Sequence, residues 1–240
     1  MKRNLSPRRV LALLALSSPF FAACNGSQEP DSNARLGDAW SGQAETVERE
    51  PLAIPADAPL VIFLGDSISA GLHLDADQAF PAVLQRRFVE REIPFRMVNA
   101  GVSGDTTAGG LRRVDWLLKQ KPQVVLVELG ANDGLRGIDV QAIESNLRQI
   151  LERIRTSGAK PILVGMHVPT SYGEPYADAF HGLYGRLAEE LAVAFVPNFL
   201  EGVGGNPQFN LPDGLHPNAQ GHKLLADNVQ AALESVLDGE

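Results

Sequence analysis

Short apolar runs alternate with longer amphipathic segments from about residue 59 to the C-terminus. The first run, Leu60 to Leu64, is followed at once by Gly65, which is typical of a strand buried on both faces. Further apolar runs predict strands at 96–100, 124–129, 162–166 and 193–196. Apolar residues at helical spacing predict helices at 77–91, 106–120, 139–156, 176–191 and 218–237.

This strict alternation predicts the architecture. Strands that are separated by helices pair in parallel, and their helical crossovers are right-handed. We therefore expect one α/β domain of three layers, with a five-stranded parallel sheet covered by helices on both faces. In such sheets the functional residues gather in the loops at the carboxyl ends of the strands.

The N-terminal segment has the pattern of an export signal. Four basic residues precede a largely apolar stretch over 10–23, which is shorter than the roughly 20 residues that span a bilayer but is typical of a secretory signal. Cys24, the only cysteine, follows two alanines, as in a bacterial lipoprotein signal. We expect residues 1–23 to be a signal peptide and Cys24 to be lipidated, so that the protein is periplasmic or anchored to a membrane. An ordinary cleaved signal with an incidental cysteine is the alternative.

Residues 24–58 are acidic and contain few large apolar side chains, so we expect a flexible linker before a folded domain at 59–240.

The composition also limits which partners and cofactors the protein can bind. The chain carries 21 basic and 29 acidic residues, a net charge of −8, which argues against binding to nucleic acid. A single cysteine excludes an intrachain disulfide and a cysteine-based zinc site.

Four segments at predicted strand ends carry side chains suited to nucleophilic catalysis. Ser67 lies in a Gly-Asp-Ser turn after the first strand, and Gly104 and Asn132 follow the second and third strands. A glycine can present its backbone N–H without a Cβ in the way, and an asparagine can offer its side-chain amide. Asp213 precedes His216 by three residues, close enough to accept the Nδ1 proton and leave Nε2 as a base. Each segment alone is more typical of an ordinary turn.

Together, however, the four segments resemble the SGNH branch of the GDSL hydrolases, a serine esterase family with a flavodoxin-like fold. The resemblance covers essentially residues 59–236, with the four segments in the family's order. Within the family, the stretches at 125–137 and 176–180 are most similar to the bacterial thioesterase I, arylesterase and lysophospholipase group. One departure, Ile68 where the family has Leu, conserves volume.

The resemblance implies a role for each residue of the four segments. Ser67 would be the nucleophile, His216 the general base and acid, and Asp213 the residue that orients His216. The backbone N–H groups of Ser67 and Gly104 and the side chain of Asn132 would form the oxyanion hole. No metal or cofactor is expected.

We therefore expect an exported serine esterase that acts on aryl esters, lysophospholipids or acyl thioesters through an acyl-enzyme intermediate. Long loops at 169–176 and 198–210 are candidate walls of the acyl pocket, with Tyr172 and Tyr176 as candidate substrate-binding residues. A carbohydrate acetylesterase is the alternative within the enzyme class. A non-catalytic binding lipoprotein and a flavin or nucleotide carrier on the same fold are alternatives from other classes, although a glycine-rich phosphate loop is missing.

Other polar residues have less specific interpretations. Glu128 interrupts an apolar strand and needs a partner if it is buried, for which Arg136 is one guess. His222 is expected to face water on the last helix, and His167 to border the pocket. The acidic and histidine residues at 73–77 are expected to form a solvated loop and a helix N-cap rather than a metal site.

Overall fold

The computed structural model describes residues 52–239, which belong to one compact unit of the chain. The predicted signal peptide, Cys24 and most of the predicted linker lie outside the described residues, and those predictions stay untested. Within 52–239, the helices are all too short or too polar to cross a membrane.

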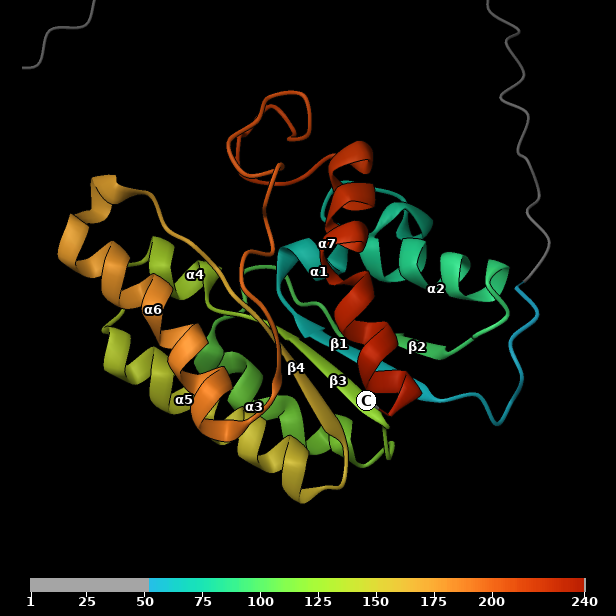
Figure 1. Cartoon of the computed structure of the whole chain (residues 1–240). Coiled ribbons are helices and arrows are strands. Elements are labelled where there is room, and N and C mark those ends of the chain that lie inside the picture. The colour runs from blue at the N-terminus through green and yellow to red at the C-terminus, as the bar shows by residue number, and fades with distance from the viewer. Residues whose placement is uncertain (1–51, 240) are drawn as a thin grey trace, which may run out of the picture. The chain divides into compact units, whose positions relative to one another are not determined.

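The core of the described domain is a parallel sheet of five strands (Figure 1). The strands lie in the order β2-β1-β3-β4-β5, and all neighbours pair in parallel, as the alternating pattern predicts. Their bounds are β1 Leu60–Gly65, β2 Arg96–Asn99, β3 Val124–Glu128, β4 Lys160–Val164 and β5 Ala194–Val196. The chain leaves β1 toward β2 on one side and returns to β3 on the other. The loops after β1 and β3 therefore diverge at a switch point, where α/β proteins bind ligands.

Helices cover both faces of this sheet, which confirms the predicted α/β fold class (Figure 1). Helix α2 (Phe80–Glu90) packs against α7 (Ala219–Asp238) on one face. On the other face α5 (Val140–Thr156) lies between α3 (Thr107–Leu118) and α6 (Glu174–Leu191). In α5 the apolar positions of the amphipathic pattern are the buried ones. They recur at helical spacing: Val140, Ile143, Leu147, Ile150, Leu151 and Ile154.

Four short helices were not predicted. Helices α1 (Ser67–Ala70) and α4 (Ala131–Leu135) directly follow β1 and β3, and two 3₁₀ turns, η1 (Ala76–Gln78) and η2 (Thr170–Tyr172), lie in longer loops. Segments of three to five residues are too short to show a helical period. The loop at 73–77 does supply an N-cap, at Asp75, but for η1.

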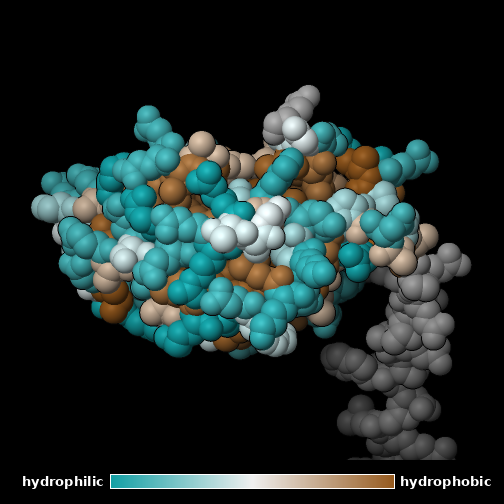
Figure 2. All heavy atoms as spheres, turned by 90° about the horizontal axis from the view of Figure 1, so that it is seen from below, coloured by the Kyte–Doolittle hydropathy of each residue, from teal (hydrophilic) through white to brown (hydrophobic). Residues whose placement is uncertain are grey.

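Most of the visible surface is hydrophilic. Figure 2 shows the domain from below the view of Figure 1, with hydrophobic residues in small separate areas between charged and polar ones. Most large apolar side chains lie instead in the core that joins the sheet to its helices, and Phe63, Phe80, Phe88 and Phe95 are fully buried there. Burial of this apolar surface is the main source of the domain's stability.

Candidate active site

Ser67 is presented by a tight turn at the carboxyl end of β1. The strand ends at Gly65, and the Asp66 side chain caps α1 by accepting the Ile68 N–H at 2.9 Å. A Cβ at Gly65 would lie 2.0 Å from the Ser69 hydroxyl, so only glycine fits there. Ser67 is consequently the first residue of α1, at the edge of the sheet where the loops converge.

A chain of hydrogen bonds links Ser67 to the loop before α7. The Ser67 Oγ lies 3.0 Å from His216 Nε2, and His216 Nδ1 lies 2.7 Å from Asp213 Oδ2. The other Asp213 oxygen accepts the backbone N–H groups of Leu215 and His216 at 2.9 and 3.0 Å. The backbone N–H of His216 contributes most to a lowered pKa of Asp213, followed by that of Leu215. Asp213 is therefore ionised and suited to accept the Nδ1 proton.

The loop that carries His216 is held at both ends. Pro217 forms a bridge to Asn210, and the side chain of Asn218 caps α7 by accepting the N–H groups of Gln220 and Gly221. A capped helix start is a rigid anchor, since its first N–H groups are already satisfied. His216 thus projects from a fixed point toward the end of β1, although it lies 149 residues away in the chain.

Asn132 lies in α4, directly after β3. Its Nδ2 donates to Asp66 Oδ2 at 2.9 Å, so the Asp66 carboxylate joins the turn of Ser67 to the side chain of Asn132. The neighbouring Asp133 accepts the N–H and hydroxyl of Thr107 at 2.9 and 2.6 Å and so links α4 to the start of α3. Ser67, Asn132 and His216 are therefore brought together at one edge of the sheet.

Gly104 lies in the loop between β2 and α3 with a positive φ of 77°, a conformation that favours glycine. Its carbonyl accepts a hydrogen bond from Arg136 at 3.0 Å. This contact shows that the guessed pairing of Arg136 with Glu128 is wrong, because the Arg136 side chain is directed to the Gly104 loop.

Arg113 holds the ends of two strands and the Gly104 loop together. From α3 its Nε donates to Asp105 at 2.8 Å, and its two Nη atoms donate to the carbonyl oxygens of Ala100 at 2.6 Å and Gly65 at 2.9 Å. The sequence pattern does not single out Arg113, because an arginine on an amphipathic helix is usually a solvated surface charge. Only the distant partners reveal its structural role.

Two buried acidic side chains, Asp66 and Glu128, meet at the turn that carries Ser67. Glu128, fully buried at the end of β3, accepts at Oε2 the Ser69 hydroxyl at 2.7 Å and the N–H groups of Asp66 and Ser69 at 3.1 and 3.2 Å. Burial raises the pKa of Asp66 to about 6, against the lowering effect of its hydrogen bonds. Burial and the nearby Asp66 raise the pKa of Glu128 well above its usual value.

A cavity of about 580 Å³ opens beside Ser67. Asn132, His167 and His216 line it together with Ser67, and seven of its other lining residues are apolar: Ile68, Ala131, Leu135, Val168, Pro169, Leu200 and Leu215. Gly104 is not among the lining residues. The cavity therefore offers an apolar wall next to a serine, a histidine and an amide donor.

The two tyrosines predicted to bind substrate lie outside the lining of this cavity. The hydroxyl of Tyr172 donates to the Leu135 carbonyl at 3.2 Å, and that of Tyr176 donates to the Ile138 carbonyl at 2.8 Å. Both instead connect the start of α6 and its preceding loop to the segment around α4. Substrate binding by either side chain stays a prediction.

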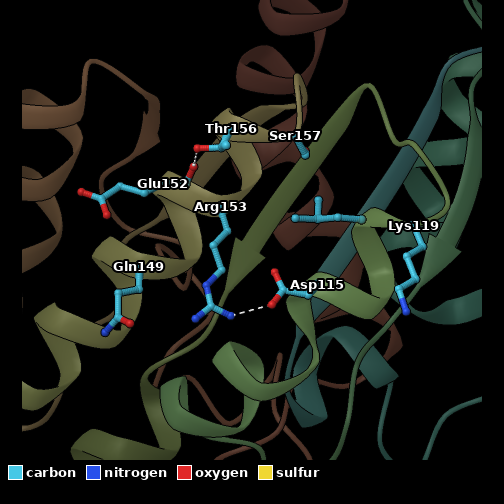
Figure 3. A pocket seen from close by; sticks show the side chains of 8 residues that line it. Asp115, Lys119, Gln149, Glu152, Arg153, Thr156 and Ser157 are labelled. Atoms are coloured by element: carbon cyan, nitrogen blue, oxygen red, sulfur yellow. Dashed lines mark hydrogen bonds and ion pairs between the residues drawn. The ribbon is translucent and has the colours of Figure 1, made fainter.

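A second hollow, between α3 and α5, has a different chemistry (Figure 3). Arg153 points toward Asp115 there and forms an exposed ion pair at 2.8 Å. The labelled side chains are otherwise polar or charged, without a nucleophile and base in contact. Among the described residues, no cluster of three or more histidine, cysteine or acidic side chains is arranged to hold a metal ion.

His222 contradicts the expectation that it faces water. Its side chain is 1% exposed, on the face of α7 that packs against α2, and its Nδ1 accepts the Phe80 N–H at 3.0 Å. Burial lowers the pKa of His222 to about 4, so the ring is neutral near neutral pH. The sequence gives no sign of this burial, because the adjacent residues are a glycine and a lysine.

A parallel α/β sheet with these residues at the carboxyl ends of its strands defines the class of the GDSL hydrolases. The model of the GDSL-like Lipase/Acylhydrolase family matches residues 63–224, and the chain belongs to this family. Esterase TesA of Pseudomonas aeruginosa is 43% identical over 183 residues, which cover 76% of this chain and 91% of that protein. Thioesterase 1/protease 1/lysophospholipase L1 of Escherichia coli K12 is 41% identical over 184 residues, covering 76% and 87%. An arylesterase of Vibrio mimicus is 40% identical over 174 residues, covering 72% and 87%.

Solved structures agree with this assignment. The crystal structure of TesA has a TM-score of 0.71 at 43% identity and covers 74% of this chain and 99% of that one. The psychrotrophic esterase EstA from Pseudoalteromonas sp. also has a TM-score of 0.71, at 31% identity, and covers 75% and 99%. The protein is thus a hydrolase of ester bonds, similar to the thioesterase, arylesterase and lysophospholipase group, as predicted.

Proposed function

We propose that the protein is a serine esterase in which Ser67 attacks the substrate, His216 moves the protons and Asp213 orients His216. The observation that carries this proposal is the continuous hydrogen-bonded chain from Ser67 Oγ to His216 at 3.0 Å and from His216 to Asp213 at 2.7 Å. A serine hydroxyl is a weak nucleophile at neutral pH, so it needs a base in contact.

The reaction proceeds in two steps. His216 Nε2 takes the Ser67 proton while Oγ attacks the ester carbonyl, and the carbonyl oxygen becomes an oxyanion. In this proposal the backbone N–H groups of Ser67 and Gly104 and the Asn132 amide donate hydrogen bonds to this oxygen, because donors that are preorganised around an oxyanion stabilise its charge. His216 then protonates the leaving alcohol or thiol. A water molecule, activated at the same histidine, releases the acid from Ser67.

The cavity favours esters with an apolar acyl or aryl group. Seven of its lining side chains are apolar, and they lie in the short helices α1 and α4, in the loops after β4 and β5, and in the loop before α7. Relatives are named as an esterase, an arylesterase and a thioesterase/lysophospholipase, which spans the same substrate classes. We propose aryl esters and lysophospholipids as the main substrates, with short to medium acyl chains, and acyl thioesters as further ones.

The test is a series of p-nitrophenyl esters of increasing chain length on wild type, Ser67→Ala and a control, Ser145→Ala, whose serine is exposed on α5. We expect Ser67→Ala to lose activity and labelling by a fluorophosphonate, while Ser145→Ala keeps both. Undiminished turnover by Ser67→Ala would refute the proposal. Activity on acetate alone would favour a carbohydrate acetylesterase, and a wild type without turnover or labelling would favour a binding lipoprotein.

The location of the enzyme is a separate proposal. We propose that residues 1–23 direct export and that Cys24 receives a lipid that holds the mature protein at a membrane, because the basic and apolar stretches end at this cysteine. Radiolabelled palmitate should be incorporated into wild type and not into Cys24→Ala. Equal incorporation in both, or none in either, would contradict lipidation at Cys24.

A further inference from the structure

Glu128 has an uneven set of hydrogen bonds. Three donors converge on its Oε2, namely the Ser69 hydroxyl and the backbone N–H groups of Asp66 and Ser69. Its Oε1 is buried and meets no donor in the part of the chain that the structure describes. An ionised carboxylate needs donors at both oxygens, and an unsatisfied oxygen in a dry site is costly. Read as a carboxylate, Glu128 is therefore incompletely satisfied.

A proton on Oε1 removes this imbalance. Asp66 is adjacent to Glu128, since Glu128 Oε2 accepts the Asp66 N–H at 3.1 Å, and the interaction of the two side chains acts to lower the pKa of Asp66. Two carboxyl groups can share a hydrogen bond only when one of them carries a proton. Asp66 already accepts the Ile68 N–H and the Asn132 amide, both donors to a carboxylate, so the proton belongs on Glu128.

The other charged or titratable groups around Glu128 leave this arrangement intact. Tyr184 approaches from α6, but its hydroxyl donates to the Leu129 carbonyl, and burial raises its pKa well above the usual value. Arg113 approaches the turn from α3, but its guanidinium is directed to Asp105 and to the carbonyl oxygens of Ala100 and Gly65. No cation is therefore in contact with Glu128 among these groups, and a neutral acid is the stable form.

We propose that Glu128 is a positioning residue that keeps a proton on Oε1 and donates it to the Asp66 carboxylate, which in turn orients the Asn132 amide toward the oxyanion. The neutral Glu128, the Asp66 carboxylate and the Asn132 amide then form one continuous chain of hydrogen bonds that reaches the cavity. One N–H of Asn132 is held by Asp66 at 2.9 Å, and the other is free for the substrate. This inference rests on the proposed role of Asn132, whereas the location of the proton can be measured without any substrate.

The first test is infrared spectroscopy of the whole protein at about pH 8, where Asp66, with a pKa of about 6, is ionised. We expect a protonated-carboxyl band in wild type that is absent from Glu128→Gln. The control Glu189→Gln, on the exposed side of α6, should keep the band. A wild-type spectrum without the band, or a band that persists in Glu128→Gln, would overturn the proposal.

The second test separates a neutral donor from a charge. Glutamine can accept the three bonds at its oxygen and donate from its nitrogen to Asp66, so Glu128→Gln should keep kcat within a few-fold of wild type. Glu128→Met loses the donor and should lower kcat by about 10-fold or more with little change in KM, as expected when an oriented hydrogen bond is lost. If Glu128→Gln loses as much kcat as Glu128→Met, or more, while its circular dichroism is native, the proposal is wrong.

The pH profile supplies a readout that a purely structural role would not change. In Glu128→Met, Asp66 lacks the donor that lowers its pKa, so the acid limb of kcat/KM should move to higher pH than in wild type and Glu128→Gln. Coinciding acid limbs in all three proteins would contradict the proposal. If Glu128→Met does not fold, the infrared band and the kcat of Glu128→Gln test the proposal without it. If the band is present and Ser67→Ala remains active, the serine mechanism fails while the assignment of the proton stands.

Discussion

The buried His222 should make the domain less stable in mild acid. Helix α2 has no side-chain cap at its own N-cap, Ala79, and His222 of α7 accepts the first helical N–H, that of Phe80, at 3.0 Å. Protonation at Nδ1 removes this acceptor and places a positive charge at the positive end of the α2 dipole. The neutral ring is therefore part of the folded structure.

The magnitude follows from the two pKa values. In the folded protein the pKa of His222 is lowered from 6.5 to about 4 by burial, so between these values the unfolded chain binds more protons than the folded one. Stability that is present above pH 6.5 is lost as the pH falls toward 4. The loss amounts to about 3 kcal/mol in total, of which about 2 kcal/mol is lost by pH 5.

The assay is urea denaturation of wild type, His222→Gln and His73→Asn at several pH values between about 7 and 5. His222→Gln should be less stable at pH 7, where it loses ring packing, but its stability should fall by about 2 kcal/mol less than that of wild type on acidification. His73 is exposed, so His73→Asn should follow wild type. Wild type must be compared with a variant because the raised pKa of Asp66 makes the folded state more stable on acidification, which partly offsets the loss of stability at His222. Equal pH slopes for wild type and His222→Gln would show that the protonation of His222 does not control the acid sensitivity of the fold.

Other substitutions test the site and its scaffold. Asn132→Ala should lower kcat by about 10²–10³ in steady-state ester hydrolysis, because an oxyanion donor is removed, and a loss below a few-fold would exclude Asn132 from that role. Arg113→Gln should lower kcat more than it raises KM, since the Gly104 loop loses its link to the end of β1, and an unchanged kcat would contradict this. In thermal unfolding, Gly185→Ala within α6 should stabilise the domain by about 0.5–1 kcal/mol, since the added Cβ meets only Phe195 at 3.9 Å. Gly65→Ala should destabilise the domain, because its Cβ would lie 2.0 Å from Ser69 Oγ. The reverse order of the two stabilities would contradict these contacts.

Much of the site is readable before the fold is known, because part of it is local. Asp213 and His216 lie three residues apart, and their contact at 2.7 Å forms within one turn. Ser67 and Asn132 directly follow apolar strands, so parallel pairing brings them to the same edge of the sheet. The contact between Ser67 and His216, by contrast, joins residues 149 positions apart, and the resemblance to the GDSL hydrolases anticipates it where the local pattern does not.

The strands, the long helices, the parallel sheet and the four candidate segments of the site could be predicted from the sequence, since hydrophobic period and turn chemistry are local properties. The partners of single polar residues emerge only in the folded chain: Glu128 faces Asp66 and Ser69 instead of Arg136, His222 is buried against α2, and Arg113 joins three segments. This difference arises because a periodic pattern specifies only which face of an element is buried. Which distant element packs on that face, and which donor or acceptor it presents there, depends on how the whole chain folds.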